Sequence, residues 1–294
     1  MISKKYIHFS LWLLLLLNIR AQGIYPILST PYSARSIALC GSGTTDSNYS
    51  ISYNPSSINT KSYIIGFHTI SLPLDVSYNR LEAIIPTNNK TLFFEIKNID
   101  YGSFYDDLEN SSFNAKETDI KLGIKKSFYD TFSGSTTIEY IYSSISSYIS
   151  QAFVTSLGIR AETLNSRNGF SVSIENNGVI FDYYNQSFER INNIYRVSGY
   201  HRLKYLPSQI NINFIHDSYK SSLASISIES TIKSIASVRF GIGSILLTNT
   251  QHFSNYNYSF GVGLKYSSYI IDFGIKNINE IGLLSGISIH YMIP

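Results

Sequence analysis

The stretch Tyr258-Ser259-Phe260-Gly261-Val262-Gly263-Leu264-Lys265-Tyr266 places a large apolar residue at every second position, and Ile271-Asp272-Phe273-Gly274-Ile275-Lys276 repeats the pattern. A period of two is that of a β-strand with one apolar and one polar face. The same period returns from about residue 60 to the end of the chain, and no comparable run there has the helical period of 3.6. This region is therefore predicted to be all-β.

Alternation fits both a soluble exported β-sandwich and a transmembrane barrel, and three features favour the barrel. The segments are about ten residues long, the length that a tilted strand needs to cross a membrane. The polar face is rich in Gly, Ser, Asn and paired charges, as expected of a lumen. Tyrosines end many apolar faces, where an aromatic girdle meets lipid headgroups; these are Tyr195, Tyr258, Tyr266, Tyr269 and Tyr291.

The period divides residues 61–294 into about 14 antiparallel strands. The predicted strands are 62–70, 74–85, 91–99, 117–126, 133–144, 149–163, 168–179, 193–204, 209–217, 221–231, 234–247, 256–267, 269–277 and 282–293. An even number of strands puts both chain ends in the periplasm and the odd-numbered connections outside the cell, where longer loops are expected. The longest predicted connections, 100–116, 180–192 and 248–255, are all odd-numbered.

Residues 1–21 have the features of a secretory signal peptide. Lys4 and Lys5 precede an apolar stretch from Ile7 to Leu17, and Ala21 supplies the small residue before the expected cleavage. The apolar stretch is shorter than the ~20 residues that a membrane-spanning helix needs. The sequence thus predicts export, and the barrel pattern places the mature chain in the outer membrane with lipid around it.

The composition excludes several classes of function. Without Lys4, Lys5 and Arg20, the chain has 20 basic and 20 acidic residues, so nothing marks a nucleic-acid-binding surface. One cysteine allows no intrachain disulfide and no cysteine-based zinc site. The chain contains no Gly-x-Ser-x-Gly motif and no His-Glu-x-x-His motif. We therefore expect no catalytic residues, no cofactor and no metal, and the scattered histidines are expected to line the lumen or lie in loops: His68, His201, His216, His252 and His290.

Residues 22–60 break the β pattern and are predicted to form a plug. Asn54 can cap a short helix that begins at Pro55, because the missing N–H of proline costs nothing at that position. Such a helix does not fit in a barrel wall, so it is expected in the lumen or at its periplasmic mouth. Arg35 and Asp46 are expected to anchor the plug to charges on the polar faces of the strands. Those charges are interpreted as ion pairs that line a plugged lumen, with a permeation path as the alternative.

The plug sequence resembles the start of the PorV/PorQ family of outer-membrane proteins, which are relatives of the FadL-type channels. That family opens with Ala-Arg-x-x-Ala-Leu-Gly-Gly, an acidic residue and Asn-Pro-Ala. The matching residues here are Ala34, Arg35, Ala38, Leu39, Gly41, Asp46, Asn54 and Pro55, whereas Cys40 and Ser56 depart from the pattern. Further along, Tyr101-Gly102-Ser103-Phe104 and Phe113-Asn114-Ala115 are similar to a loop of the PorQ branch.

The resemblance implies a FadL-like barrel of 14 strands that acts without catalysis in the type IX secretion system of Bacteroidota-type bacteria. In that system it would hold a surface component, a PorZ-like protein, of the complex that processes and attaches secreted cargo. It could also meet other components of the system.

The outward loops are the expected partner-binding surface, because aromatic side chains at loop tips are frequent interface hot spots. The candidates are Tyr101, Phe104 and Phe113 in 101–115, and Phe181, Tyr183 and Tyr184 in 180–192. The same rings could instead rest at the lipid headgroups. The alternative function is a channel for hydrophobic small molecules, which requires an apolar pocket near the plug and a lateral opening between strands.

Overall fold

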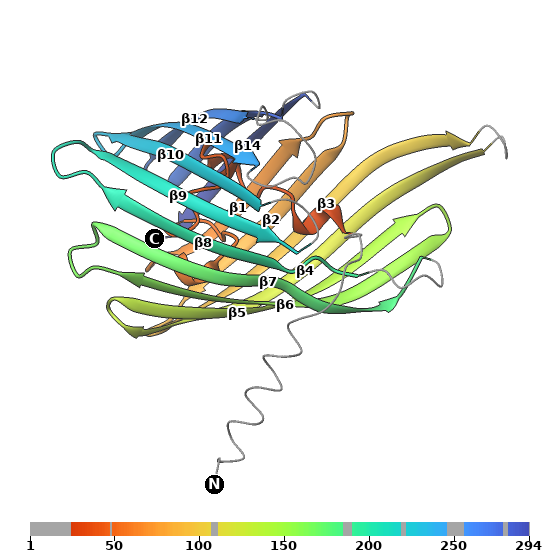
Figure 1. Cartoon of the computed structure of the whole chain (residues 1–294), viewed down its shortest axis with the longest axis horizontal. Coiled ribbons are helices and arrows are strands. Elements are labelled where there is room, and N and C mark those ends of the chain that lie inside the picture. Colours follow the sequence, from red (N-terminus) through yellow and green to blue (C-terminus); the bar gives the residue numbers. More distant parts are fainter. Residues whose placement is uncertain are drawn as a thin grey trace, which may run out of the picture.

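The computed structural model describes residues 25–47, 49–106, 111–184, 190–218, 222–245, 256–278 and 282–293. The predicted signal peptide and the predicted connection 248–255 lie outside these residues. Within them, fourteen antiparallel strands follow one another around a closed barrel, and β1 pairs with β14 (Figure 1). The strands are β1 Tyr63–Ser71, β2 Ser77–Pro86, β3 Lys90–Asp106, β4 Ser111–Tyr129, β5 Phe132–Ile145, β6 Tyr148–Glu162, β7 Asn168–Asp182, β8 Ile194–Arg202, β9 Ser208–Asp217, β10 Ser222–Ile232, β11 Ala236–Ile245, β12 Tyr256–Tyr266, β13 Tyr269–Asn277 and β14 Leu283–Ile293. This confirms the predicted barrel and excludes the soluble β-sandwich.

Large apolar side chains cover the outside of the barrel and polar ones line the inside. In β1, for example, Ile65 and Phe67 are each 48% exposed, whereas His68 between β2 and β14 is fully buried. Exposed Leu, Ile, Phe and Val side chains continue around the other strands. A continuous apolar surface of this kind requires lipid rather than water, so the barrel is of the outer-membrane type.

The prediction that residues 100–116 form a loop is wrong. β3 continues to Asp106 and β4 begins at Ser111, so this region is a hairpin that projects beyond its neighbours (Figure 1). The two strands have 17 and 19 residues, against the roughly ten that cross a membrane. β3 continues for six residues beyond Asp100, its last partner in β2, which is roughly 20 Å along the strand at about 3.4 Å per residue. β7 likewise continues to Asp182, into the predicted loop 180–192.

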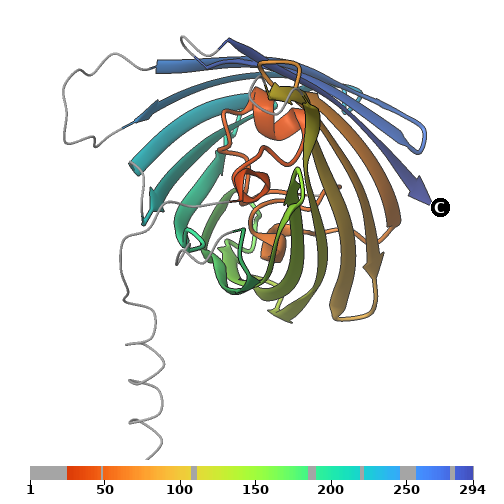
Figure 2. The ribbon, with the colours of Figure 1, turned by 90° about the vertical axis from the view of Figure 1, so that its right-hand side faces the viewer.

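Residues 25–47 and 49–58 lie inside the barrel, and the segment 25–62 that contains them is called the plug below (Figure 2). It contains a 3-10 helix η1 (Pro26–Leu28), a one-turn helix α2 (Ala34–Ala38) and a 3-10 helix η2 (Pro55–Ser57). Ser33 and Asn54 cap α2 and η2, each accepting a hydrogen bond from the amide of Ser36 or Ser56. None of the described helices has the length and apolar character to span a membrane.

Apolar side chains of the plug pack against the wall near both ends of the lumen. Near the odd-numbered connections, Ile27 and Leu28 of η1 pack against inward-facing wall residues that include Ile99 and Ile141. Near the even-numbered connections, Ile51 and Ile58 pack with wall residues such as Phe93. The hydrophobic core of this protein therefore lies between the plug and the wall, and polar contacts occupy the space between the two clusters.

Candidate functional site: the plugged lumen and its outer mouth

Helix α2 lies directly on a patch of the wall that has no side chains. A Cβ added to Gly274 would come 2.2 Å from the carbonyl oxygen of Ala34, and one added to Gly261 would come 2.3 Å from Cβ of Ala38. Only glycine permits such close approach of two backbones. The glycines on the polar faces of β12 and β13 thus form the seat for α2.

Hydroxyl groups connect the plug to strands around the lumen. Ser42 and Thr44 bond Ser227 of β10 and Ser198 of β8 at 2.6 and 2.8 Å. On the other strands, further bonds join the plug to Ser133, Ser171, Ser259 and Ser288. Buried polar groups are stable when they are hydrogen-bonded, so the serine-rich inner face of the wall matches a polar backbone inside it rather than free water.

Arg35 of α2 joins the plug to β10 through an ion pair. Its Nη2 lies 2.5 Å from Oε2 of Glu229, and its Nη1 donates to the carbonyls of Gly43 and Asp46 at 3.2 and 2.9 Å. Arg239 also pairs with Glu229, at 2.7 Å, and with Asp272, at 2.6 Å. The carboxylate of Glu229 holds the pKa of Arg35 above its ordinary value despite burial, so Arg35 is charged at any physiological pH.

The other predicted plug residues also contact the wall. Asp46 pairs with Arg202 of β8 at 2.8 Å. The side-chain amide of Asn54 donates to the carbonyl oxygens of Ile159 and Val172 at 3.2 Å while its oxygen caps η2. Pro55 is the first residue of η2 and is buried.

Tyr32 lies at the centre of a second charged cluster. Its ring faces the cationic groups of Arg80, Lys97 and Lys121 at 4.9, 5.1 and 4.6 Å, and Lys121 donates to its hydroxyl at 2.6 Å. Burial raises the pKa of the Tyr32 hydroxyl, which therefore stays neutral. These cations are paired with Glu82, Glu95, Asp119 and Glu139. The inward charges are thus ion pairs around a filled lumen, as the sequence favours.

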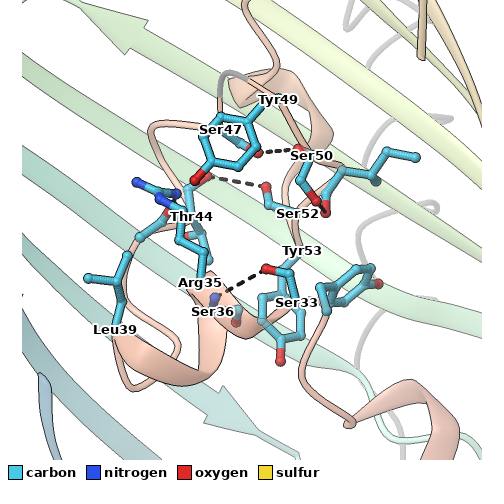
Figure 3. Close-up of a pocket in the computed structure, with 13 residues that line it drawn as sticks. Ser33, Arg35, Ser36, Leu39, Thr44, Ser47, Tyr49, Ser50, Ser52 and Tyr53 are labelled. Atoms are coloured by element: carbon cyan, nitrogen blue, oxygen red, sulfur yellow. Dashed lines mark hydrogen bonds between the residues drawn. The ribbon is translucent and has the colours of Figure 1, made fainter. Parts of the chain in front are cut away.

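The space inside the plug itself is very small. The pocket between Arg35, Thr44, Ser47, Tyr49 and Tyr53 has a volume of ≈ 20 Å³ (Figure 3). A water molecule needs about 10–15 Å³ by this kind of measure. This pocket is therefore too small for a hydrophobic solute.

A charged vestibule of ≈ 580 Å³ opens at the end of the barrel that carries the even-numbered connections, where short turns and the periplasm are expected. Its lining includes both plug–wall ion pairs, Arg35 with Glu229 and Asp46 with Arg202. Water and polar solutes can approach the plug from this side.

An apolar cavity of ≈ 360 Å³, called the mouth cavity below, lies at the opposite end. It brings together four of the six predicted partner-binding residues, Tyr101, Phe104, Phe113 and Tyr184, and Pro26 of η1 lines it as well. Phe104 and Phe113 are register partners across the β3–β4 hairpin, and their rings stack at 5.4 Å. The mouth cavity therefore lies between the projecting hairpin and the plug.

The remaining two predicted binding residues lie elsewhere. Phe181 is 51% exposed and stacks on Phe153 of β6 at 5.3 Å, on the lipid-facing side of the wall. Tyr183 is 37% exposed and does not line the mouth cavity. Phe181 thus has the surroundings expected of a ring at the membrane boundary.

No protein-family model matches this chain, and no curated protein matches it. Solved structures share its architecture. The toluene transporter TodX of Pseudomonas putida aligns with a TM-score of 0.64 at 9% identity, over 90% of this chain and 99% of TodX. CymD, a monoaromatic hydrocarbon channel, aligns with a TM-score of 0.69 at 9% identity, over 90% of this chain and 98% of CymD. A Pseudomonas aeruginosa FadL homologue gives 0.58 at 9% identity, over 92% of this chain and 100% of its own.

The barrel has a FadL-like fold. At 9% identity this likeness concerns the fold alone, and the resemblance to the PorV/PorQ family stays a prediction. Sequence reasoning identified the plug but not its partners, because Gly274, Ser227 and Ser198 look like ordinary small residues on a polar strand face.

Proposed function

We propose that this barrel takes up hydrophobic small molecules through the outer membrane, without catalysis. The mouth cavity carries the proposal, because it is lined by aromatic rings and lies next to η1, whose Ile27 and Leu28 extend the apolar surface inward. A cavity of about 150 Å³ already holds benzene. The mouth cavity, at ≈ 360 Å³, therefore has room for a monoaromatic hydrocarbon or part of an acyl chain. Two barrels with this fold are described as a toluene transporter and a monoaromatic hydrocarbon channel, which supports the assignment.

Passage beyond the mouth cavity requires the plug to move. In the part nearest the cavity, η1 is held by a bond from the amide of Ile27 to Glu117 at 2.9 Å and by the bond between Tyr25 and Ser150 at 2.7 Å. The rest of the plug is fixed by the Arg35 and Asp46 ion pairs and by the glycine seat. We therefore expect η1 to yield first when a ligand enters.

The wall also offers an apolar groove of ≈ 460 Å³, where the small outward residues Gly199, Ala224 and Ser244 lie among Ile212 and Phe214. The strands that carry it remain hydrogen-bonded to one another. This groove supports a route toward lipid, but a lateral opening would need these strands to separate.

Uptake of labelled toluene and of a labelled fatty acid, by cells with and without the protein, tests the proposal. We expect faster uptake with the protein, and a several-fold loss at limiting concentration when Phe113→Ser removes one stacked ring from the mouth cavity. Phe128→Ser is the matched control, because it removes one ring of the tilted Phe128–Phe132 pair at the other end of the wall. Equal uptake with and without the wild-type protein would refute the proposal.

The second candidate is the anchoring of a surface protein, as the PorV/PorQ resemblance implies. The β3–β4 hairpin favours it, because the hairpin projects beyond the wall and exposes Tyr105 by 61% and Phe104 by 45%. Deletion of residues 104–113 should then release a surface protein of the attachment complex into the medium. Retention of that protein, together with loss of hydrocarbon uptake, would favour the channel over the anchor.

A further inference from the structure

His68 of β1, Glu82 of β2 and His290 of β14 meet inside the barrel where its first and last strands pair. Nε2 of His68 and Nε2 of His290 each lie 3.1 Å from the same oxygen, Oε1 of Glu82. The ligand atoms of all three residues lie within 4.8 Å of one another, and the side chains are fully buried. We propose that this cluster binds one Zn²⁺ ion.

The strand register builds the cluster around a missing side chain. Gly66 is the direct partner of His290 on one side and of Glu82 on the other. A Cβ at position 66 would lie 2.7 Å from Oε1 of Glu82 and 2.8 Å from Cδ2 of His290. Glycine thus lets the two side chains meet across β1, and His68 joins them from two positions farther along the same face.

Surrounding groups orient the three ligand atoms toward one another. Oε2 of Glu82 is occupied by Nη2 of Arg80 at 2.5 Å and by the amide of Ile51 at 2.8 Å, which leaves Oε1 for the histidines. Nδ1 of His68 lies 2.8 Å from Oγ of Ser288, which positions that ring. Contacts of this kind are what orients the histidine and carboxylate ligands of metal sites.

The separation of the ligand atoms suits zinc. Zinc binds histidine nitrogen and carboxylate oxygen at about 2.0–2.2 Å, so tetrahedral ligands lie about 3.4 Å apart. The two N–O separations of 3.1 Å are near that value. Two histidines and one glutamate form a known three-ligand zinc set that leaves the fourth position to water. Nδ1 of His290 has no hydrogen-bond partner among the described groups, so Nε2 provides the polar contact of this ring.

The cluster belongs to a buried network of charged side chains. Glu82 belongs to a buried network that links four carboxylates, Glu82, Glu95, Asp119 and Glu139, to three cations, Arg80, Lys97 and Lys121. In contrast, Arg35 and Arg239 balance Glu229 and Asp272 in the other large network among the described residues. In the network that contains Glu82, carboxylates therefore outnumber cations by one.

A bound ion would connect β1, β2 and β14 at the seam of the barrel. The backbone amide of Ile51 donates a hydrogen bond to Glu82, and the backbone amide of Ala34 donates one to Ser288. The plug therefore covers the same site. The ion would thus stabilise both the closed wall and the seated plug.

Metal analysis of the full-length protein in detergent tests the inference directly. The barrel is refolded after chelation, with Zn²⁺ or with Co²⁺, whose visible absorption reports tetrahedral nitrogen and oxygen ligands. We expect one ion per folded chain. In His290→Ala we expect the affinity for the metal to fall by about 100-fold or more. Loss of a residue that only orients a ligand already costs about 10–100-fold, and His290→Ala removes a ligand itself.

His216→Ala is the matched control, because His216 lies on β9 away from the cluster and should leave binding unchanged. The shift of the folded band on unheated gels verifies that each variant has formed its barrel. A folded wild-type protein that takes up no Zn²⁺ or Co²⁺ would overturn the inference. Equal binding by wild type and by the His68→Ala, His290→Ala double variant would overturn it as well.

Discussion

Arg35 of the plug and Glu229 of β10 form a two-point ion pair, with Nη2 2.5 Å from Oε2 and Nε 3.1 Å from Oε1. Both side chains are 12% exposed. Such parallel contacts combine charge with fixed geometry. The pair and the glycine seat therefore together fix the position of α2 in the lumen.

Arg35→Ala should loosen the plug. Removal of one partner from a buried ion pair costs about 3–5 kcal/mol, and we expect the lower end, because Glu229 keeps Arg239. The temperature at which the folded band disappears on gels should fall, and conductance in planar bilayers should rise. Arg167→Ala, at an exposed turn position, is the control. If heat stability and conductance both stay at the wild-type level, the ion pair does not hold the plug.

Gly274→Ala should displace α2 from its seat. The added methyl would lie 2.2 Å from the carbonyl oxygen of Ala34, and neither backbone can rotate away as a flexible side chain could. Overpacking of this kind costs about 1–3 kcal/mol. We expect a lower melting temperature for the folded band, whereas Gly199→Ala, whose methyl meets nothing nearer than 3.3 Å, should change it less. Equal effects of the two variants would argue against the seat.

A reversible lock can test whether uptake needs plug movement. A Cβ at position 243 would lie 2.9 Å from Sγ of Cys40, and in a disulfide each Cβ lies about 3 Å from the far sulfur. Gly243→Cys should therefore cross-link the plug to β11, and Cys40 is the chain's single natural cysteine. Under oxidising conditions uptake should fall, and a reductant should restore it. Gly243→Ser is the control, and unchanged uptake by the cross-linked protein would show that uptake needs no movement of the plug at Cys40.

Alkaline pH should weaken the plug through Tyr53. Burial raises the pKa of Tyr53 to about 12 from the ordinary value near 10, although Arg196, 3.9 Å from the ring, opposes the shift. A raised pKa means that the unfolded state loses its proton first. The stabilisation is therefore complete below pH 10 and is lost as the pH rises toward 12, by up to roughly 3 kcal/mol.

Melting of the folded band at pH 8 and pH 11 measures this effect. Tyr53→Phe should reduce the difference between the two temperatures, whereas Tyr205→Phe, at a position 86% exposed, should not. An equal pH response of wild type and Tyr53→Phe would assign the alkaline loss to other groups.

The strands could be predicted because lipid imposes alternation on each of them separately. The predicted strand 269–277 coincides with β13, and most other ends agree within a few residues. The strands of the projecting hairpin were not predicted, because lipid imposes no alternation on residues beyond the membrane. The polar residues Ser103 and Asn114 interrupt the apolar period of residues 100–116, and beyond Asp100 the described strand β3 pairs with β4 and no longer with β2.

The partners of the site residues could not be predicted, because they come from distant parts of the chain and no local sequence pattern indicates them. Arg35 and Asp46 were predicted to meet wall charges, but their partners Glu229 and Arg202 could not be chosen among the inward charges. Glu82 and His290 are 208 positions apart and meet because the barrel closes β1 against β14. The alternation predicted that His290 faces inward, and the register of three strands decides what it faces.

Closure of β1 on β14 around an occupied interior places a constraint on biogenesis. Ala34 forms a hydrogen bond with Ser288 in β14, and Arg80 in β2 donates to the carbonyl of Tyr32, so plug residues contact strands on both sides of the seam between β1 and β14. If the barrel closed before the plug entered, inward-facing guanidinium and carboxylate groups would be buried without their partners in the plug. We therefore expect the plug to take its place in the lumen before β1 and β14 pair.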